Sequence, residues 1–242
     1  GQNIISGMGE LHLEIMVDRL QREFRVECKA GTPRVAYRET ITQATDSETK
    51  FEQSLDGKVQ FAFCRISLEP LEAGGGFEFE NKLSADELPS NFAEAVEEGI
   101  QGAMSNGVLA GFAMIDLKAT LIAADYEEEL STEVAFSIAG INVLRAGVKK
   151  AKPTLLEPSM KIEVVSPVSF TGEVIGDLNA RHGRIRGMEE QGGIQVISAE
   201  APLAEMFGYS TRLRSLTQGR ASFTMHFSHY SSVTEATRKA LT

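Results

Sequence analysis

The sequence contains no tryptophan, only two cysteines and no long apolar run. Cys28 and Cys64 are far apart and form no CxxC pair, so we expect two reduced thiols and neither a disulfide framework nor a zinc site. No stretch of about 18 apolar residues is present, and the first residues show no basic segment followed by an apolar one. We therefore expect a cytoplasmic globular protein without a membrane span or a secretory signal.

Motifs for nucleotide or metal chemistry are also missing. Gly74-Gly-Gly76 is not followed by Gly-Lys-Ser/Thr, so it is not a phosphate-binding loop, and we expect a hairpin turn there. His226 and His229 are three positions apart on an expected strand, where their side chains leave on opposite faces. We predict no catalytic residue, no metal site and no cofactor within the chain.

The negative charge is confined to the middle of the sequence. Residues 36–153 carry ten basic and twenty acidic side chains, whereas the segments before and after it are balanced, so the whole net charge of -10 lies in this middle part. Such a segment is repelled by phosphate backbones unless local basic patches override its average charge.

The first 35 residues predict one amphipathic helix and about two strands. The helix has an apolar face with three-four spacing, formed by Leu13, Met16, Val17, Leu20 and Phe24, and residues 25–35 favour a strand. One helix and two strands cannot bury a core of their own. We expect 1–35 to be the second half of a domain and the chain to be a fragment.

Residues 36–153 predict an α+β domain. Strand patterns cover 59–68, 77–80 and 115–121, and apolar stripes predict helices over 92–103 and 131–150. Mixed strands and helices in one segment are typical of α+β folds.

Residues 154–230 predict the order βαββαβ. Strands are expected at 160–165, near Ile185, at 194–198 and at 223–227, with helices at 170–178 and from Pro202 to Gly219. This order is that of the ferredoxin-like sandwich. Residues 231–242 are polar, and we expect a loose tail.

Six arginines accompany the two helices of this last domain. They are Arg181, Arg184 and Arg186 at the end of the first helix, and Arg212, Arg214 and Arg220 on or after the second. They form either a solvated basic face or an RNA contact, since guanidinium groups bind phosphate in a bidentate manner. Residues 194–198 lack the stacking aromatics of an RNA-recognition motif. Any RNA contact should therefore recognise the shape and the phosphates of the RNA.

Long strings of the sequence resemble bacterial elongation factor G, the translocation GTPase. They are GMGELHLEI at 7–15, VAYRET at 35–40, DLNARHGRIRGM at 177–188 and the segment 201–220. The resemblance covers nearly the whole chain. It implies a partial domain III that is ferredoxin-like at 1–35, a domain IV with a ribosomal protein S5 domain 2-like fold at 36–153, and a ferredoxin-like domain V at 154–230.

The same resemblance implies a function. The full-length protein of which this chain is a part is expected to be a ribosome-dependent GTPase. Its GTP and Mg²⁺ are expected to bind to an N-terminal domain that is absent from this chain. The expected partner is the ribosome, with the six arginines on ribosomal RNA and domain IV reaching the messenger and transfer RNA in the decoding site. We expect a monomer.

Two loops at the expected tip of domain IV depart from the family pattern. They are Ser54, Leu55, Asp56, Gly57 and Lys58, where the family has a glycine-rich loop with an arginine, and Tyr126, Glu127, Glu128 and Glu129, where it has Tyr-His. Extra carboxylates at the tip should weaken phosphate contacts. We therefore expect a paralogue that serves recycling or another ribosomal step.

Two alternatives are left open. The chain could be a non-catalytic RNA-binding module, or part of a ribosome-protection protein of the tetracycline-resistance type. The run Leu213-Arg-Ser-Leu-Thr-Gln-Gly in the last helix resembles elongation factor G instead of the protection proteins.

Overall fold

The computed structural model describes residues 10–26, 35–55 and 57–241. These residues divide into two compact units. We call Tyr37–Leu156 with Tyr230–Thr242 the acidic unit, and Gly1–Ala36 with Glu157–His229 the sandwich unit. Each unit is described by itself.

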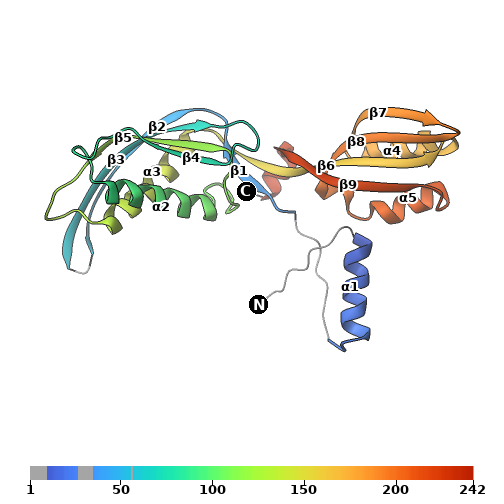
Figure 1. The fold of residues 1–242 in the computed structure, drawn as a ribbon, viewed down its shortest axis with the longest axis horizontal. Helices are drawn as coiled ribbons and strands as arrows, with labels where there is room; N and C mark the ends of the chain where they lie inside the picture. Colours follow the sequence, from blue (N-terminus) through green and yellow to red (C-terminus); the bar gives the residue numbers. More distant parts are fainter. Residues whose placement is uncertain (1–9, 27–34, 56, 242) are drawn as a thin grey trace. The chain divides into compact units, whose positions relative to one another are not determined.

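The acidic unit is built on a four-stranded sheet with the order β2-β3-β5-β4 (Figure 1). Strands β2 (Thr45–Leu55), β3 (Lys58–Pro70) and β5 (Leu117–Asp125) are antiparallel neighbours. Strand β4 (Phe77–Asn81) pairs with β5 in parallel, through the crossover helix α2 (Ser90–Asn106). The mixed sheet confirms the predicted α+β class.

The expected hairpin at Gly74–Gly76 is wrong, because β5 lies between β3 and β4. The glycines instead form a loop around Asp116, whose Oδ1 accepts hydrogen bonds from the backbone nitrogens of Gly74 at 3.1 Å and Gly76 at 2.9 Å. Both glycines have positive φ, of 87° and 71°, which side chains disfavour. The local sequence indicates a turn here, but it does not show that β5, a strand from later in the chain, lies between β3 and β4 in the sheet.

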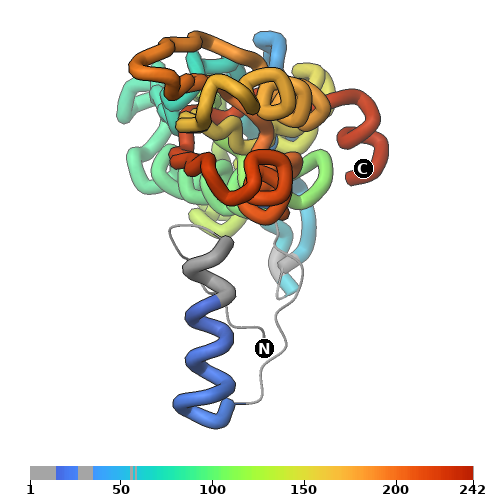
Figure 2. The backbone as a smooth tube through the Cα atoms, turned by 90° about the vertical axis from the view of Figure 1, so that its right-hand side faces the viewer, coloured from blue at the N-terminus to red at the C-terminus, as the bar shows by residue number. Residues whose placement is uncertain are grey.

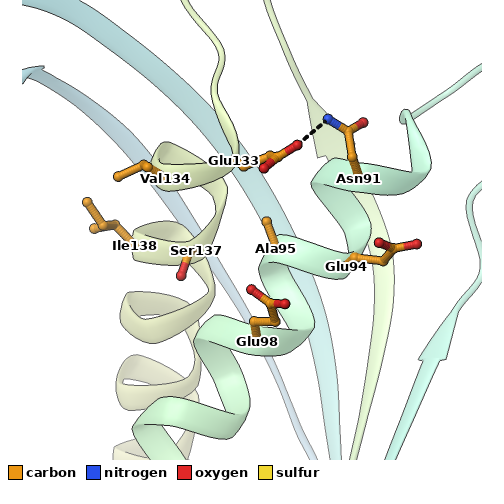
Figure 3. A pocket seen from close by; sticks show the side chains of 8 residues that line it. All are labelled: Asn91, Glu94, Ala95, Glu98, Glu133, Val134, Ser137 and Ile138. Carbon is orange, nitrogen blue, oxygen red and sulfur yellow. Dashed lines mark hydrogen bonds between the residues drawn. The ribbon is translucent and has the colours of Figure 1, made fainter.

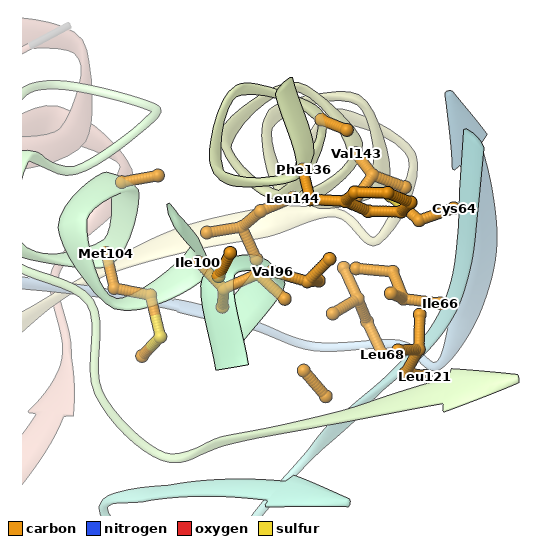
Figure 4. Packing of buried hydrophobic residues seen from close by; sticks show 14 of the residues in the cluster. Cys64, Ile66, Leu68, Val96, Ile100, Met104, Leu121, Phe136, Val143 and Leu144 are labelled. Atoms are coloured by element: carbon orange, nitrogen blue, oxygen red, sulfur yellow. The ribbon is translucent and has the colours of Figure 1, made fainter. Parts of the chain in front are cut away.

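Helix α2 and helix α3 (Glu133–Lys150) pack against this sheet and against each other. Their inner faces bury residues of both helices over the strands, with Phe136, Val96, Leu68 and Leu121 among the fully buried side chains (Figure 4). The two helices touch backbone to backbone at glycine. A Cβ on Gly99 would meet the carbonyl oxygen of Ser137 at 2.1 Å, and one on Gly140 would meet that of Val96 at 2.5 Å.

The acidic unit is completed by β1 (Arg38–Ile41), which pairs antiparallel with the first residues of β6 (Pro153–Pro167). A loose tail was expected at 231–242, but the described residues of this segment are regular: β9 (Ser222–Ser232) is followed by helix α6 (Glu235–Leu241), which lies next to the C-terminus in Figure 2. Thr234 Oγ1 accepts a hydrogen bond from the backbone nitrogen of Thr237 at 3.2 Å. The Thr234 side chain therefore caps the start of α6, a helix that the polar composition of the segment did not indicate.

The sandwich unit has the predicted order βαββαβ. After β6 come the short η1 (Val168–Phe170), α4 (Thr171–Ala180), β7 (Arg184–Gln191), β8 (Ile194–Pro202), η2 (Leu203–Met206), α5 (Tyr209–Thr217) and β9. Strand β6 lies between β8 and β9, and β7 is at the edge. The core joins Val174 and Leu178 of α4 and Leu213 of α5 to Ile162 and Ile197 of the sheet.

The helix expected from Pro202 to Gly219 is broken into η2 and α5. Gly208 separates them with a left-handed φ of 73°, although the apolar spacing continues across the break. Met206 and Leu213 are buried on either side of it, whereas Phe207 is 36% exposed. The periodicity therefore described the packing face correctly and missed the interruption.

Helix α1 (Glu10–Arg22) precedes both sheets in the chain. It carries exposed i,i+4 ion pairs between Arg19 and Glu23 and between Arg22 and Asp18. The strand expected at 25–35 falls mostly on 27–34, outside the described residues. No helix in the described part of the chain is long and apolar enough to cross a membrane.

Candidate nucleic-acid interface

The first predicted tip loop is the turn between β2 and β3. Leu55 and Lys58 are paired across the two strands, and Gly57 lies in the turn with φ 80°. Such a φ favours glycine, which explains the glycine at this position. Ser54 is exposed, and Asp56 lies outside the described residues.

The second predicted tip loop follows β5 and leads into α3. The backbone nitrogens of Leu130 and Ser131 both donate to the carbonyl oxygen of Glu127, at 3.0 and 2.8 Å, so the loop is a closed turn. Glu127, Glu128 and Glu129 are exposed. Tyr126 turns inward, with its ring 5.8 Å from that of Phe92 on α2.

The structure brings the two loops to the same end of the sheet. The backbone nitrogen of Phe61, three residues after the first loop, donates to the carbonyl oxygen of Leu130 at 2.9 Å. Thr132 caps α3 by accepting from the backbone nitrogen of Ala135 at 3.2 Å, and its hydroxyl donates to Gln60 Oε1 at 2.6 Å. Sequence separation gave no sign of these contacts between β3 and the start of α3.

Carboxylates also neutralise the nearest described cation on β2. Lys50 Nζ is 2.6 Å from Glu52 Oε2 and lies over the Phe61 ring, 5.4 Å from its centroid. The hydrogen bond and charge of Glu52, followed by the charge of Glu127, raise the pKa of Lys50 above its usual value. Lys50 therefore offers phosphate little unopposed positive charge.

An acidic hollow of about 360 Å³ lies between α2 and α3 (Figure 3). Its carboxylates are Glu94, Glu98 and Glu133, and Glu133 accepts a hydrogen bond from Asn91 at 3.0 Å. Val134 at its edge is 59% exposed. The three glutamates make the surface between the two helices negatively charged.

Two of the six predicted arginines are held by one carboxylate in the sandwich unit. Asp177 on α4 binds Arg181 through Oδ2 at 2.9 Å and Arg212 on α5 through Oδ1 at 3.1 Å. Arg181 also donates to the carbonyl oxygens of Glu205 and Phe207. Its side chain is 19% exposed, so it ties α4 to the segment before α5 and presents little surface to a ligand.

The other four arginines are exposed, as is Arg212, and they differ in their partners. Arg186 on β7 binds Glu200 Oε2 at 2.6 Å, and the Arg220 guanidinium stacks over Phe170, 4.6 Å from the ring centroid. Arg184 on β7 and Arg214 on α5 form no ion pair with any described residue. These two are the arginines whose charge is most available for phosphate.

Sequence reasoning missed the organising role of Asp177. The i,i+4 spacing of Asp177 and Arg181 on one helix was a readable signal for an ion pair. The contact with Arg212 comes from tertiary packing and had no such signal. Beside this cluster, Tyr209 is fully buried, its hydroxyl has no hydrogen-bond partner among the described residues, and burial raises its pKa.

Comparisons with known proteins agree with this architecture. Family models match in chain order: Elongation Factor G, domain III at residues 1–32, Elongation factor G, domain IV at 33–152, and Elongation factor G C-terminus at 154–241. A crystal structure of a protein from Thermus thermophilus matches with a TM-score of 0.85 and 38% sequence identity over 97% of this chain. This chain covers 35% of the length of that protein. With three consecutive models of one family matched across both units, the chain belongs to the elongation factor G family.

Proposed function

We propose that this chain is the ribosome-engaging part of a translational GTPase. The sandwich unit contacts ribosomal RNA through its exposed arginines, and the tip of the acidic unit enters the decoding site beside messenger and transfer RNA. GTP and Mg²⁺ bind to another part of the full-length protein, because the present sequence contains no phosphate-binding loop.

The observation that carries the proposal is that both tip loops lie at the same end of the acidic unit's sheet, where the second loop is bonded to β3 close to the first. The Phe61 to Leu130 hydrogen bond, which ties β3 to the residue after the second loop, supports this grouping, although about 70 positions separate the two loops in the chain. Two loops gathered on a rigid sheet and helix are the usual arrangement of a binding surface.

We further propose that the protein, because of its acidic tip, acts in a ribosomal step other than ordinary translocation, such as recycling. Three exposed glutamates occupy the second loop, and the pKa of Lys50 is raised by carboxylates around it. RNA affinity is largely built from contacts between cations and phosphates, so this tip should hold RNA weakly.

The experiment is a loop exchange in the full-length protein. Residues 54–60 are rebuilt with glycines and an arginine, residues 126–130 are replaced by a Tyr-His-Glu-Val-Asp loop, and the two exchanges are tested singly and together. Messenger movement on pre-translocation ribosomes is followed by a toehold assay. We expect the double exchange to speed movement by about tenfold, since a few screened phosphate contacts contribute roughly 1 to 3 kcal/mol. A parent protein that already translocates as fast as a conventional elongation factor G contradicts the proposed specialisation.

A further inference from the structure

We propose that Ser131 is a positioning residue that locks the second tip loop onto β3 and so fixes its place beside the first tip loop. This inference rests on the proposed function for its meaning on the ribosome, although the lock itself is a property of the acidic unit. Ser131 is the residue between the second tip loop and the cap of α3.

The Ser131 hydroxyl ties the second loop to β3, three residues beyond the first loop. Its Oγ donates to the carbonyl oxygen of Phe61 on β3 at 2.8 Å and accepts from the backbone nitrogen of Glu127 at 3.0 Å. One side-chain atom therefore bridges the strand that leaves the first loop and the first acidic residue of the second. A hydroxyl can do this because it donates and accepts at once.

The groups around Ser131 are themselves packed and hydrogen-bonded, which allows its bonds to hold the second loop in place. Phe61 is 7% exposed, and the Phe61 nitrogen returns a second bond to Leu130. On the other side, Thr132 caps α3, whose Ala135 and Phe136 are fully buried. The loop is thus held between the buried Phe61 of β3 and the first turn of α3, which is anchored by Ala135 and Phe136.

Removing the hydroxyl leaves two backbone groups without their partner. In Ser131→Ala, the Glu127 nitrogen and the Phe61 oxygen lose this bond, while the Phe61 to Leu130 bond stays. The loop then opens locally more often, without unfolding of the core. Ser131→Thr keeps the hydroxyl and should keep the lock. Ser105→Ala is the matched control, because Ser105 Oγ also donates to a backbone oxygen, that of Gln101, on the exposed side of α2.

The test uses the 242-residue chain with Cys28→Ser, Ser54→Cys and Glu128→Cys, with nitroxide labels on the two new thiols. We measure the distance distribution between the labels and the hydrogen exchange of the Glu127 amide. Ser131→Ala should broaden the distribution and speed the exchange of Glu127 by about tenfold, while core amides of β3 keep their protection. Ser131→Thr should restore both readouts, and Ser105→Ala should change neither. An unchanged distribution in Ser131→Ala, or a failure of Thr to restore it, overturns the inference.

A second readout separates this inference from the proposed function. A cleavage reagent tethered at position 128 of the full-length protein reports contact with the decoding region of ribosomal RNA. Ser131→Ala should reduce and spread that cleavage. If neither the parent nor the variant cleaves the decoding region, the proposed function fails, while the label distances still decide whether Ser131 is the lock.

Discussion

The carboxylate of Glu39 lies 2.7 Å from the backbone nitrogen of Val108, inside the acidic unit. The same carboxylate accepts from the backbone nitrogens of Leu109, Ala110 and Phe112 at 2.7, 2.8 and 3.0 Å. Glu39 is fully buried, so four N–H groups of one loop converge on a single charge from β1. A nest of this kind stabilises a buried anion that would otherwise be costly.

Glu39→Gln should therefore destabilise the acidic unit by about 3 kcal/mol. The amide has the same shape, but it removes the charge and turns an NH₂ group toward N–H donors. Hydrogen exchange of the core amides of β3 and α3 measures the change in this unit alone. Glu48→Gln, at an exposed position on β2, is the control and should change exchange by less than about twofold. Equal protection in both variants contradicts the role assigned to Glu39.

The contact between α2 and α3 predicts opposite effects for glycines of the same helix. Gly99→Ala would place a Cβ against the Ser137 carbonyl and should cost about 2 kcal/mol or more, because the backbones must separate. Gly102→Ala, where nothing lies within 4 Å, should stabilise the helix by about 0.5 to 1 kcal/mol. Urea unfolding followed by circular dichroism tests this, since the sequence has no tryptophan to report by fluorescence. A Gly99→Ala variant as stable as Gly102→Ala would falsify the close approach.

The arginines of the sandwich unit should separate stability from RNA binding. The double variant Arg184→Glu, Arg214→Glu should bind the ribosome more weakly, with little loss of stability. The slope of log affinity against log salt concentration should fall by the equivalent of about two phosphate contacts. Arg181→Ala should instead destabilise the unit by about 2 kcal/mol, because it unties α4 from Glu205 and Phe207. Co-sedimentation with ribosomes across a salt series, together with thermal unfolding, distinguishes the two effects. If the double variant sediments like the parent protein at every salt concentration, the assignment of these arginines is wrong.

The buried thiol of Cys64 predicts a pH dependence of stability. Burial raises its pKa from the ordinary 9.0 to about 12. Below pH 9 the thiol is neutral in both states, whereas between pH 9 and 12 it ionises only in the unfolded chain, so stability falls as the pH rises through this window. In a Cys28→Ser variant, a disulfide reagent at pH 8 should label Cys64 only as fast as the chain unfolds. Rapid labelling of the native protein contradicts this burial.

Much of the fold was predictable because its signals are local. Apolar periods in 154–230 gave the βαββαβ order, and the predicted α+β class is confirmed in both sheets. The insertion of β5 between β3 and β4 was not predictable, because parallel pairing through α2 is decided by packing at a distance. The start of α6 depended on one capping contact of Thr234, which a polar composition does not reveal.

The candidate site was predictable in residue type more than in geometry. The sequence placed six arginines near two helices. It could not show that Asp177 forms ion pairs with Arg181 and Arg212, or that Glu200 forms one with Arg186. These partners come from other elements of the fold. The roles of the arginines and of the tip loops in RNA binding remain predictions.

The most direct test of the account places a hydroxyl-radical source at the tip of the full-length protein on the ribosome. Iron-EDTA is tethered at Glu128→Cys in a Cys28→Ser background, with Glu163→Cys on β6 of the sandwich unit as the control, and cleavage of small-subunit ribosomal RNA is mapped by primer extension. We predict cleavage in the decoding region from position 128 and none there from position 163. The absence of decoding-region cleavage from position 128, or equal cleavage from both positions, would contradict the account.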